Sequence, residues 1–574
     1  MNTFKRKKWM IPDPISEKEL EEIVEHIKCS SLFAKVLASK FGKDLNRIDD
    51  FLSSDLSQLK DPFIIKDLEK GAMRVISAIH SNERICVYGD FDMDGLTATA
   101  LLYTVLQELG ADVLSYIPDR IDEGYGISQN ALQKLIEKGV SVVISVDCGI
   151  KSNEEVSFLK KNKVDMIITD HHEPGIKIPD AYAVINTKLN SEDNGLRELA
   201  GVGIAFKLAH GILKIWKESK KSEIDFDLRW LLDFVAIGTI ADVVPLTGEN
   251  RILVKSGMKI LAQTRKTGLQ YVMERCNIKK SINPYHVAFL IAPRFNAAGR
   301  LGKAEEALEL LLTNEILVAD KLSLKMEEYN EERKNIEQLI MEEADSMMKE
   351  SVNDFIAVLE KESWHTGVIG IVASKLSEKW KKPVILIGSE KENRRGSGRS
   401  FGDFNLIEAL DQMSELFQSF GGHKAAAGLS IEEKNISQLK SRLNDYAGKC
   451  SKDIFMDKLF VASICMAKDL NIDNINELSR MQPFGFGNPQ PVFLIKNMQL
   501  ISTPKILKQK HVSFRFKKDD MFFSAIWFSG KEYLESQQEM IPDTFYDIAF
   551  QPDINDYYSP PRLSLKIVDM AASE

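Results

Sequence analysis

The chain has 574 residues, 44% of them hydrophobic and 28% charged, which is typical of a globular protein with several domains. Its 75 Lys and Arg against 84 Asp and Glu give a net charge of −9, which excludes a histone-like polycation but not a local basic channel. No uncharged apolar run is long enough for a transmembrane helix, and the basic start lacks the apolar core of a signal peptide. None of the six cysteines form a CxxC pair, so neither zinc binding nor a disulfide framework is indicated, and a reducing cytoplasm is expected.

The first 270 residues show two patterns. Residues 1 to about 60 are predicted to be helical, with an amphipathic pattern over Glu17 to His26. Residues 61 to about 270 alternate short apolar runs with helical patterns, which favours a parallel α/β sheet. The predicted strands of this sheet are Ile85–Tyr88, Val142–Val146, Asp165–Thr169 and Ala183–Ile185.

A predicted connector opens the second half of the chain. Residues from Ala304 to about Glu350 lack Pro and Gly and are predicted to form one or two long, solvated helices. A second α/β lobe is expected after them, with strands at Phe355–Leu359 and Pro383–Ile387 and then a glycine-rich turn.

The last region, from about residue 456, has strand patterning. Val512, Phe514 and Phe516 alternate with polar and basic side chains, and 518–520 is predicted to turn the chain back into a strand over 521–528. A small β-barrel is therefore expected. Basic residues interleaved with aromatics suit single-stranded nucleic acid, but the same pattern fits a solvated strand face over an aromatic core.

The segment YGDFDMDGLT, residues 88–97, carries the strongest chemical signal. Asp90, Asp92 and Asp94 follow an apolar strand at a spacing that puts all three on one face of an extended backbone. Three such carboxylates repel one another unless a cation neutralises them or one of them keeps its proton, and oxygen ligands suit Mg²⁺ or Mn²⁺. An EF-hand is excluded, because position 12 counted from Asp90 is Leu101.

Acids and histidines also follow three later candidate strands or apolar runs. Asp147 follows 142–146, the triplet Asp170-His171-His172 follows 165–169, and Asp242 follows Ile237–Ala241. Ligands bind at the carboxyl edge of open α/β sheets, so these side chains are expected to converge there. Imidazole favours Mn²⁺ over Mg²⁺, and Asp147 is placed to bridge two ions. The predicted reaction class is metal-assisted phosphoester hydrolysis.

Two nucleotide-binding motifs, the dinucleotide fingerprint and the ATP-binding P-loop, are not completed in this sequence. Gly201-Val202-Gly203 begins like a dinucleotide fingerprint, but Phe206 takes the place of the third glycine, so helix packing or a turn is expected there. No Gly-Lys pair is followed by Ser or Thr, so the sequence gives no sign of an ATP-binding P-loop.

These motifs resemble the DHH phosphoesterase superfamily and, within it, the RecJ family of single-stranded-DNA-specific exonucleases. The resemblance covers roughly residues 60–574, and Met93 departs from it at a non-ligand position where Ala is common. It rests on YGDFDMDGLT, Asp147, Asp170-His171-His172 and IGTIADVVPL (237–246), together with Arg120 and EGYGIS (123–128), PRFNAAGRL (293–301), WHTGVIGIVASKL (364–376), GSGRS (396–400), GGHKAAAG (421–428) and PFGFGNPQPVF (483–493).

The resemblance implies two α/β lobes, DHH with a parallel sheet and DHHA1, joined by a long helix and followed by an OB-like β-barrel. It also implies processive 5′→3′ degradation of single-stranded DNA to mononucleotides, with two Mn²⁺ or Mg²⁺ ions, in recombination and repair. The expected domains are a helical region at 1–60, a DHH domain at 61–270, a linking region at 271–350, a DHHA1 domain at 351–455 and an OB domain at 456–574.

The resemblance also implies functional residues. Asp90 and His172 are expected to act in catalysis, either as ligands, as orienting groups or as contacts to the scissile phosphate. Arg394, Arg395 and Arg399, with Ser397, stand among glycines that would let a backbone approach phosphate, and an exposed loop is the alternative for that stretch. The expected metal ligands are Asp92, Asp94, Asp147, His171 and Asp242. The expected substrate-binding residues are Arg120, Arg300, Ser397, Arg399 and His423.

Other functions remain open at this point. A small-substrate DHH phosphodiesterase, acting on short oligonucleotides or cyclic dinucleotides, would need no third domain. A catalytically inactive DHH scaffold would be expected to have lost motif residues, and none is lost here. Activity on RNA is not excluded. The resemblance suggests single-stranded-DNA-binding protein and a RecQ-type helicase as partners of a monomer that needs no membrane.

Overall fold

The chain forms two compact units in the computed structural model, and each is described by itself. The parallel-sheet unit comprises Ser53–Asn335 with Pro483–Pro489, and the barrel unit comprises Met1–Leu52, Ile336–Gln482 and Gln490–Glu574. No helix among the described residues is long and apolar enough to cross a membrane. The structure describes residues 7–119, 123, 126–190, 195–219, 225–278, 281–349, 354–390, 393–536, 540–555 and 559–573.

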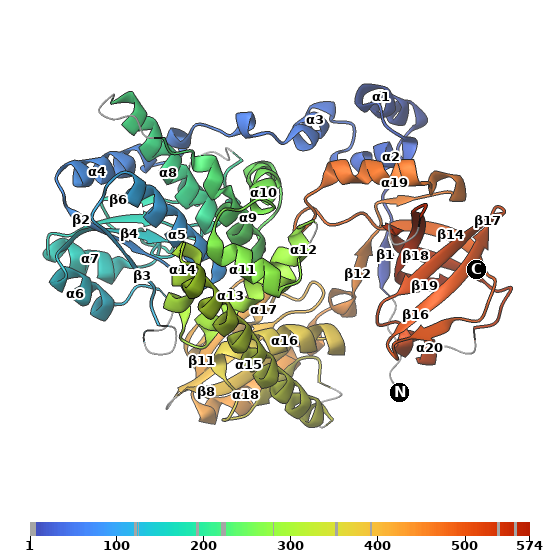
Figure 1. The fold of residues 1–574 in the computed structure, drawn as a ribbon. Helices are drawn as coiled ribbons and strands as arrows, with labels where there is room; N and C mark the ends of the chain where they lie inside the picture. Colours follow the sequence, from blue (N-terminus) through green and yellow to red (C-terminus); the bar gives the residue numbers. More distant parts are fainter. Residues whose placement is uncertain are drawn as a thin grey trace. The chain divides into compact units, whose positions relative to one another are not determined.

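A five-stranded, all-parallel sheet lies at the centre of the parallel-sheet unit, in the order β3-β2-β4-β5-β6 (Figure 1). All four predicted strands are present, and the short, half-buried edge strand β3 is the additional one. The strands are β2 (Arg84–Tyr88), β3 (Val113–Tyr116), β4 (Val140–Val146), β5 (Asp165–Thr169) and β6 (Ala183–Ile185).

Helices cover both faces of this sheet. Ile85 and Val87 pack into one core with α4, α5 and α8, whereas Cys86 and Tyr88 pack into another core with α6 and α7. This alternation is the period of two that a strand imposes on its side chains. These helices are α4 (Leu68–His80), α5 (Met93–Glu108), α6 (Gln129–Glu137), α7 (Asn153–Lys161) and α8 (Gly201–Glu218).

The remainder of the parallel-sheet unit is helical. The run Ile237–Ala241 is the end of helix α9 rather than a strand; every residue from Leu232 to Ile240 is buried, so no polar face reveals the helical period. The predicted connector consists of two helices, α14 and α15, and α15 continues from one unit into the other. The helices are α9 (Leu232–Ala241), α10 (Gly248–Leu261), α11 (Thr267–Arg275), α12 (Pro284–His286), α13 (Ala292–Arg300), α14 (Ala304–Leu312) and α15 (Ile316–Met348), with a π-helix at Val287–Ile291.

The barrel unit contains a second α/β sheet, of order β10-β11-β9-β8-β7, in which only the β7–β8 pair is parallel. The stretch 394–399, expected as a turn or an exposed loop, is instead the central strand β9. Its glycines serve packing: a Cβ on Gly396 would lie 2.7 Å from Leu429 Cδ1. The elements are β7 (Ala357–Glu360), β8 (Val384–Glu390), β9 (Asn393–Arg399), β10 (Phe417–Gly422), β11 (Ala426–Ile431), α16 (Thr366–Trp380), α17 (Leu406–Asp411) and α18 (Glu433–Lys449).

A seven-stranded sheet forms the predicted barrel, because a pairing between β14 and β16 joins strands distant in the sheet order. The predicted hairpin is present, and its turn residues Asp519 and Asp520 have φ of 48° and 59°, as a type I′ turn requires. The elements are β13 (Ser463–Ile464), β14 (Phe493–Leu500), β15 (Lys505–Leu507), β16 (His511–Lys518), β17 (Met521–Trp527), β18 (Phe545–Asn555), β19 (Arg562–Ala572), α19 (Ile472–Glu477) and α20 (Lys531–Ser536).

The predicted N-terminal helices are present and are anchored to the barrel unit. Trp9 Nε1 donates a hydrogen bond of 2.7 Å to Asp569 Oδ2, and Ser30 Oγ donates one of 2.5 Å to Glu477 Oε2. A short parallel strand pair, which the sequence did not predict, adds backbone hydrogen bonds. The elements are β1 (Lys8–Met10), α1 (Glu17–Ile27), α2 (Ser31–Phe41), α3 (Leu45–Ser53) and β12 (Lys458–Phe460).

Candidate metal and nuclease site

Helix N-termini hold two of the predicted acidic ligands. Asp92 caps α5, and its Oδ1 accepts hydrogen bonds from the backbone N–H groups of Asp94 (3.0 Å) and Gly95 (3.2 Å). Asp94 is buried, and its two oxygens accept from the N–H groups of Gly201 (2.7 Å) and Val202 (2.9 Å) at the start of α8. Exposed N–H groups and the helix dipole favour negative charge at these positions.

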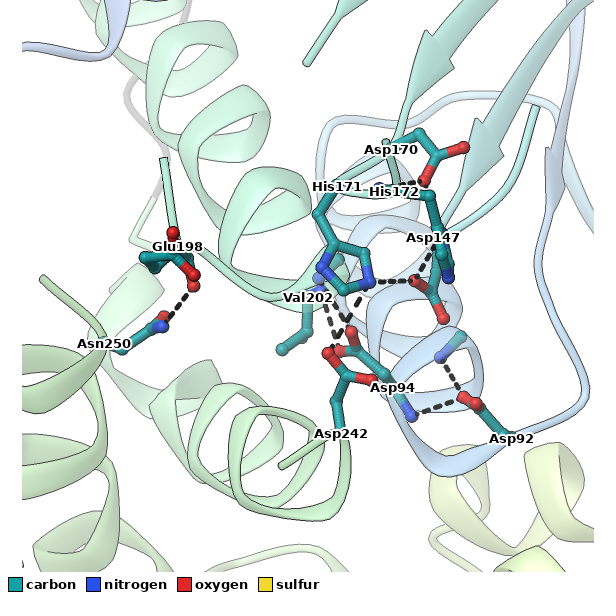
Figure 2. Close-up of polar contacts among 12 residues, drawn as sticks. Asp92, Asp94, Asp147, Asp170, His171, His172, Glu198, Val202, Asp242 and Asn250 are labelled. Atoms are coloured by element: carbon teal, nitrogen blue, oxygen red, sulfur yellow. Dashed lines mark hydrogen bonds and ion pairs between the residues drawn. The ribbon is translucent and has the colours of Figure 1, made fainter. Parts of the chain in front are cut away.

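The other predicted ligands converge on the same place (Figure 2). His171 Nε2 lies 3.2 Å from Asp147 Oδ1 and 3.5 Å from Asp242 Oδ2. Asp147 follows β4 with a φ of 61°, a conformation that costs energy in a residue with a side chain and often marks a functional site. The ends of β2, β4, β5 and α9 therefore supply one acidic and imidazole cluster.

Three overlapping groups in this cluster have ligand atoms within 4.8 Å of one another. Asp147 belongs to two of them, which is the arrangement that a carboxylate bridging two ions requires. The groups are Asp94, His171 and Asp242; Asp90, Asp92 and Asp147; and Asp147, His171 and His172.

Burial and mutual repulsion dominate the electrostatics of the cluster. Burial, followed by the charge of Asp92, raises the pKa of Asp94 to about 7. Burial and the surrounding carboxylates raise the pKa of Asp147 and Asp242 well above the ordinary range. Burial lowers the pKa of His171 to about 3, so this imidazole is neutral and able to act as a ligand. A cation bound among these buried carboxylates would relieve their mutual repulsion, so the cluster favours cation binding.

The residues present fit a divalent ion. Asp147 Oδ1, His171 Nε2 and Asp242 Oδ2 are buried and have no hydrogen-bond partner among the described residues. Buried polar atoms in folded proteins are nearly always satisfied, so three ligand atoms that face one another without a hydrogen-bond partner suit a bound cation. Carboxylate oxygens with one imidazole are a donor set for Mn²⁺ or Mg²⁺.

Asp170 and His172 form a pair beside this cluster. His172 Nδ1 lies 2.8 Å from Asp170 Oδ1, and Asp170 also accepts from the N–H groups of His172 (3.0 Å) and Ile150 (2.9 Å). Burial opposes the charged imidazole, but the hydrogen bond and the charge of Asp170 outweigh it and raise the pKa of His172. Asp170 thus orients the second histidine. Asp90 is buried, and its Oδ1 accepts from the N–H group of Phe91 (2.8 Å).

Sequence reasoning missed the residues that support the ligands. A Cβ on Gly201 would lie 2.6 Å from Asp147 Oδ1, and a Cβ on Gly299 would lie 2.2 Å from the carbonyl oxygen of Phe91. Asn296 Oδ1 accepts a 2.8 Å hydrogen bond from the N–H group of Met93. The available signal was a glycine pair at a helix start, Gly201-Val202-Gly203, which binds a carboxylate rather than a dinucleotide.

The predicted substrate residues occur in both units. Arg300, half-buried, ends α13 of the parallel-sheet unit, and Arg120 lies outside the described residues. In the barrel unit, Ser397 and Arg399 lie on β9, and His423 is exposed just after β10.

The arginines of β9 differ in their partners. Arg399 donates to Ser397 Oγ (3.1 Å) and to the carbonyl oxygen of Gly398 (2.8 Å), and no carboxylate among the described residues forms an ion pair with it. Burial lowers the pKa of its guanidinium. Arg394 instead pairs with three carboxylates, Glu360 (3.1 Å), Glu362 (3.7 Å) and Glu433 (2.9 Å), which corrects its assignment to phosphate binding. The backbone of β9 is likewise engaged in the sheet.

The aromatic residues of the barrel hairpin also separate into two classes. Phe514 and Phe516 are buried in the barrel interior, so their alternation with basic residues reflects a core. Phe522 is 69% exposed, and Lys517, its partner across the hairpin, lies 5.9 Å from the centre of its ring. The exposed Phe522 ring and the Lys517 ammonium group therefore lie together on the outer face of the hairpin.

Comparisons with known proteins agree with this arrangement. The chain matches the DHH family, N-terminal domain, over residues 84–239, the DHHA1 domain over 353–449 and the RecJ OB domain over 463–569. It is 34% identical to the single-stranded-DNA-specific exonuclease RecJ of Bacillus subtilis, over 99% of this chain and 71% of that protein. The structure of RecJ from Thermus thermophilus with Mn²⁺ matches with a TM-score of 0.84 and 28% identity, over 100% of this chain and 80% of that one. The same enzyme with Mg²⁺ matches with a TM-score of 0.78 and 26% identity, over 99% and 79%.

Proposed function

Because the chain belongs to the RecJ family of single-stranded-DNA-specific exonucleases, we propose that it is a metal-dependent hydrolase that degrades single-stranded DNA. The observation that carries the proposal is the buried cluster of orphaned ligand atoms around Asp147. The cofactor is Mn²⁺ or Mg²⁺, as in the related structures. Digestion is proposed to run 5′→3′ and to release mononucleotides.

The proposed ligands divide around Asp147. His171 and Asp242 with Asp94 would hold one ion, and Asp92 with Asp90 would hold the other. Asp147 shares one group with Asp90 and Asp92 and another with His171 and His172. Two bound divalent ions would polarise the scissile phosphate and acidify water. No side-chain nucleophile is then needed, and the backbone N–H groups of α8 keep Asp94 in place.

We assign His172 to the substrate phosphate rather than to a metal. Its Nδ1 is engaged by Asp170, and its raised pKa favours the imidazolium, which cannot ligate a cation but can donate to an anion. Asp170 acts as a positioning residue. Asp90, whose Oδ1 binds the N–H group of Phe91, shapes the loop that carries Asp92.

The DNA backbone is proposed to be held by Ser397, Arg399 and His423 of the barrel unit, with Arg120 and Arg300. Arg399 supports this role best, because it is a partly buried cation without a carboxylate partner among the described residues. Single-stranded-DNA-binding protein and a RecQ-type helicase remain proposed partners of a monomer. The cytoplasm, where chromosomal single strands arise, is the proposed site of action.

End-labelled DNA tests the proposal. Purified protein is incubated with single-stranded and duplex DNA, labelled at the 5′ or the 3′ end, with Mn²⁺ or with chelator. Early release of labelled mononucleotide from the 5′ end, only from single strands and only with metal, is expected. Turnover of dinucleotides without digestion of long strands would contradict the proposal and favour a small-substrate phosphodiesterase.

Asp147→Ala supplies the matched variant. It is expected to abolish hydrolysis while binding of single-stranded DNA persists, because the bridging carboxylate is lost and the DNA contacts are not. Asp180→Ala is the control, since Asp180 is an exposed carboxylate in the same unit that pairs with Lys160. Hydrolysis retained by Asp147→Ala would overturn the two-metal assignment.

A further inference from the structure

The segment 483–489, PFGFGNP, belongs to a different unit from the chain on either side of it. Gln482 and Gln490 are part of the barrel unit, whereas Pro483–Pro489 packs as part of the parallel-sheet unit. The mechanism proposed above gives these seven residues no role. Their contacts within the parallel-sheet unit show what they support.

The segment is a closed and rigid turn. The N–H group of Gly485 donates to the carbonyl oxygen of Asn488 (2.9 Å), and the N–H group of Asn488 donates to the carbonyl oxygen of Gly485 (3.1 Å). The Asn488 side chain is fully buried, and its Nδ2 donates to the carbonyl oxygen of Pro483 (2.8 Å). Hydrogen bonds within the segment therefore fix the shape of the turn, independently of its contacts with the rest of the unit.

Its partner is the loop 243–247, directly after Asp242. The carbonyl oxygen of Phe486 accepts a 2.8 Å hydrogen bond from the N–H group of Leu246. Gly487 has a φ of 70°, and a Cβ there would lie 2.8 Å from Pro245 Cβ; a Cβ on Gly485 would lie 2.6 Å from Leu246 Cδ1. The two glycines let the backbone of the turn lie directly against the loop.

The loop needs such support. Val243, next to Asp242, has a φ of 60°, which is strained for a β-branched residue, and its side chain is 62% exposed. Its own packing therefore does little to hold this conformation. A strained backbone persists when its surroundings determine it, and the docked turn is such a surrounding.

The loop is also tied to the support of Asp94. Asn250 is buried, and its Nδ2 donates to the carbonyl oxygens of Pro245 (3.1 Å) and Glu198 (2.5 Å), the latter drawn in Figure 2. Glu198 lies three residues before Gly201, whose N–H group binds Asp94. One side chain thus connects the loop after Asp242 to the helix start that holds Asp94.

We propose that 483–489 is a positioning element of the metal site, which fixes the loop 243–247 and thereby the Asp242 carboxylate. The inference rests on the proposed assignment of Asp242 as a ligand. A segment far from Asp242 in the sequence, but in the same unit, then takes part in metal affinity. Groups that orient metal ligands typically contribute about 10- to 100-fold to metal affinity.

Mn²⁺ titration calorimetry on the full chain tests this. Gly487→Ala and Asn488→Ala are expected to weaken Mn²⁺ binding about tenfold and to raise the Mn²⁺ concentration that gives half-maximal hydrolysis. The hydrolysis rate should recover at saturating Mn²⁺, and binding of single-stranded DNA in chelator should equal that of the unmodified protein, which shows that the variants are folded. Phe486→Ala retains the docking carbonyl and should bind Mn²⁺ normally.

Gly448→Ala is the matched control, because a Cβ there would meet Phe355 Cε2 at an ordinary 3.5 Å. Unchanged Mn²⁺ affinity in both Gly487→Ala and Asn488→Ala would overturn the inference. Asp242→Ala distinguishes a failure of the positioning role of 483–489 from a failure of the assignment of Asp242 as a ligand. If it weakens Mn²⁺ binding and the segment variants do not, only the positioning role fails; if it also binds Mn²⁺ normally, the ligand assignment fails with it.

Discussion

The acidic cluster of the parallel-sheet unit and strand β9 of the barrel unit use charge in opposite ways. Asp94, Asp147 and Asp242 are gathered with no Lys or Arg ion-pair partner among the described residues, and their pKa values are raised. On β9, Arg394 is surrounded by Glu360, Glu362 and Glu433. Charge that the protein leaves uncompensated marks the place where a ligand must supply the opposite charge.

Strand β9 contains both cases within six residues. Arg394 has its carboxylates, whereas Arg399 is partly buried against Ser397 and has no carboxylate partner among the described residues. Burying a charge is unfavourable unless a partner compensates it. Arg394 is therefore explained by the fold, and Arg399 is the arginine that we propose for a DNA phosphate.

Gly201→Ala breaks the acidic cluster most directly. The new Cβ would lie 2.6 Å from Asp147 Oδ1, so the Asp147 carboxylate must move while the N–H group that binds Asp94 is kept. Displacement of a catalytic group by about 1 Å costs about 100-fold in rate, which steady-state hydrolysis of labelled single strands would measure.

Gly203→Ala is the control in the same helix. Its Cβ would meet Leu199 Cδ2, the end of a flexible side chain, at 3.2 Å. It is expected to keep the rate within about twofold, because only the end of the Leu199 side chain has to shift and the Asp147 carboxylate is not among the atoms that the new Cβ would meet. Equal losses in both variants would show that helix α8, rather than Asp147, is what the substitution disturbs.

Arg399→Ala and Arg394→Ala sharpen the comparison on β9. Loss of a hydrogen bond to a charged group costs about 1.5–3 kcal/mol, so Arg399→Ala should raise KM for single-stranded DNA more than about tenfold with little change in Tm. Arg394→Ala should lower Tm by a few degrees and leave KM unchanged, because its carboxylate partners are intramolecular. An equal rise in KM in both variants would contradict the distinction.

The acidic cluster was predictable from the sequence because its members follow apolar runs, and the carboxyl ends of the parallel strands β2, β4 and β5 lie at one edge of the sheet. The expectation of a glycine-rich turn at 394–399, with an exposed loop as its alternative, was wrong for a physical reason, because the stretch is strand β9. Gly396 packs on Leu429 and Gly398 packs on Leu406, and neither neighbour is visible in the local sequence. The Glu433 that engages Arg394 is 39 residues away along the chain.

The supports of the ligands were hidden for the same reason. Gly201 reads locally as a turn or a packing residue, and its function exists only because Asp147 and Asp94 approach it from two other elements. Helix α9 was hard to recognise because it is buried on all sides. Local sequence patterns thus revealed the charged groups. The residues that restrain these groups could be identified only from the three-dimensional structure.

The raised pKa values predict a pH dependence of the metal-free protein. A carboxyl whose pKa is higher in the folded state binds more protons there, so stability falls as pH rises from the unfolded value near 3.9 towards the folded one. For Asp94, whose pKa is raised to about 7 by burial and by Asp92, that window ends near neutral pH. In chelator, Tm should therefore fall between pH 5 and pH 7, an interval of about two units inside this window.

Asp147→Asn should reduce this fall in Tm, because it removes one of the mutually repelling carboxylates. Mn²⁺ at 100 times Kd should add about 2.7 kcal/mol to the folding stability of the unmodified protein and thereby raise its Tm. The rise in Tm should be smaller for Asp147→Asn. A metal-free protein whose Tm increases from pH 5 to pH 7 would contradict the electrostatic account of the cluster.

The barrel hairpin offers the smallest effect and the same contrast between exposed and enclosed groups. Phe522 is exposed and contacts Lys517 with its ring, whereas Phe516 on the neighbouring strand is buried. Stacking of one base on one ring is worth about 1–3 kcal/mol at most sites, and an edge position should fall at the low end. Phe522→Ala is therefore expected to weaken binding of long single strands about fivefold in fluorescence anisotropy and to leave Tm unchanged. Phe516→Ala should lower Tm strongly, since removing a buried Phe side chain costs about 3–5 kcal/mol. If Phe522→Ala binds DNA normally, the exposed face of the hairpin is a solvated surface, and the grip on DNA must come from elsewhere in the chain.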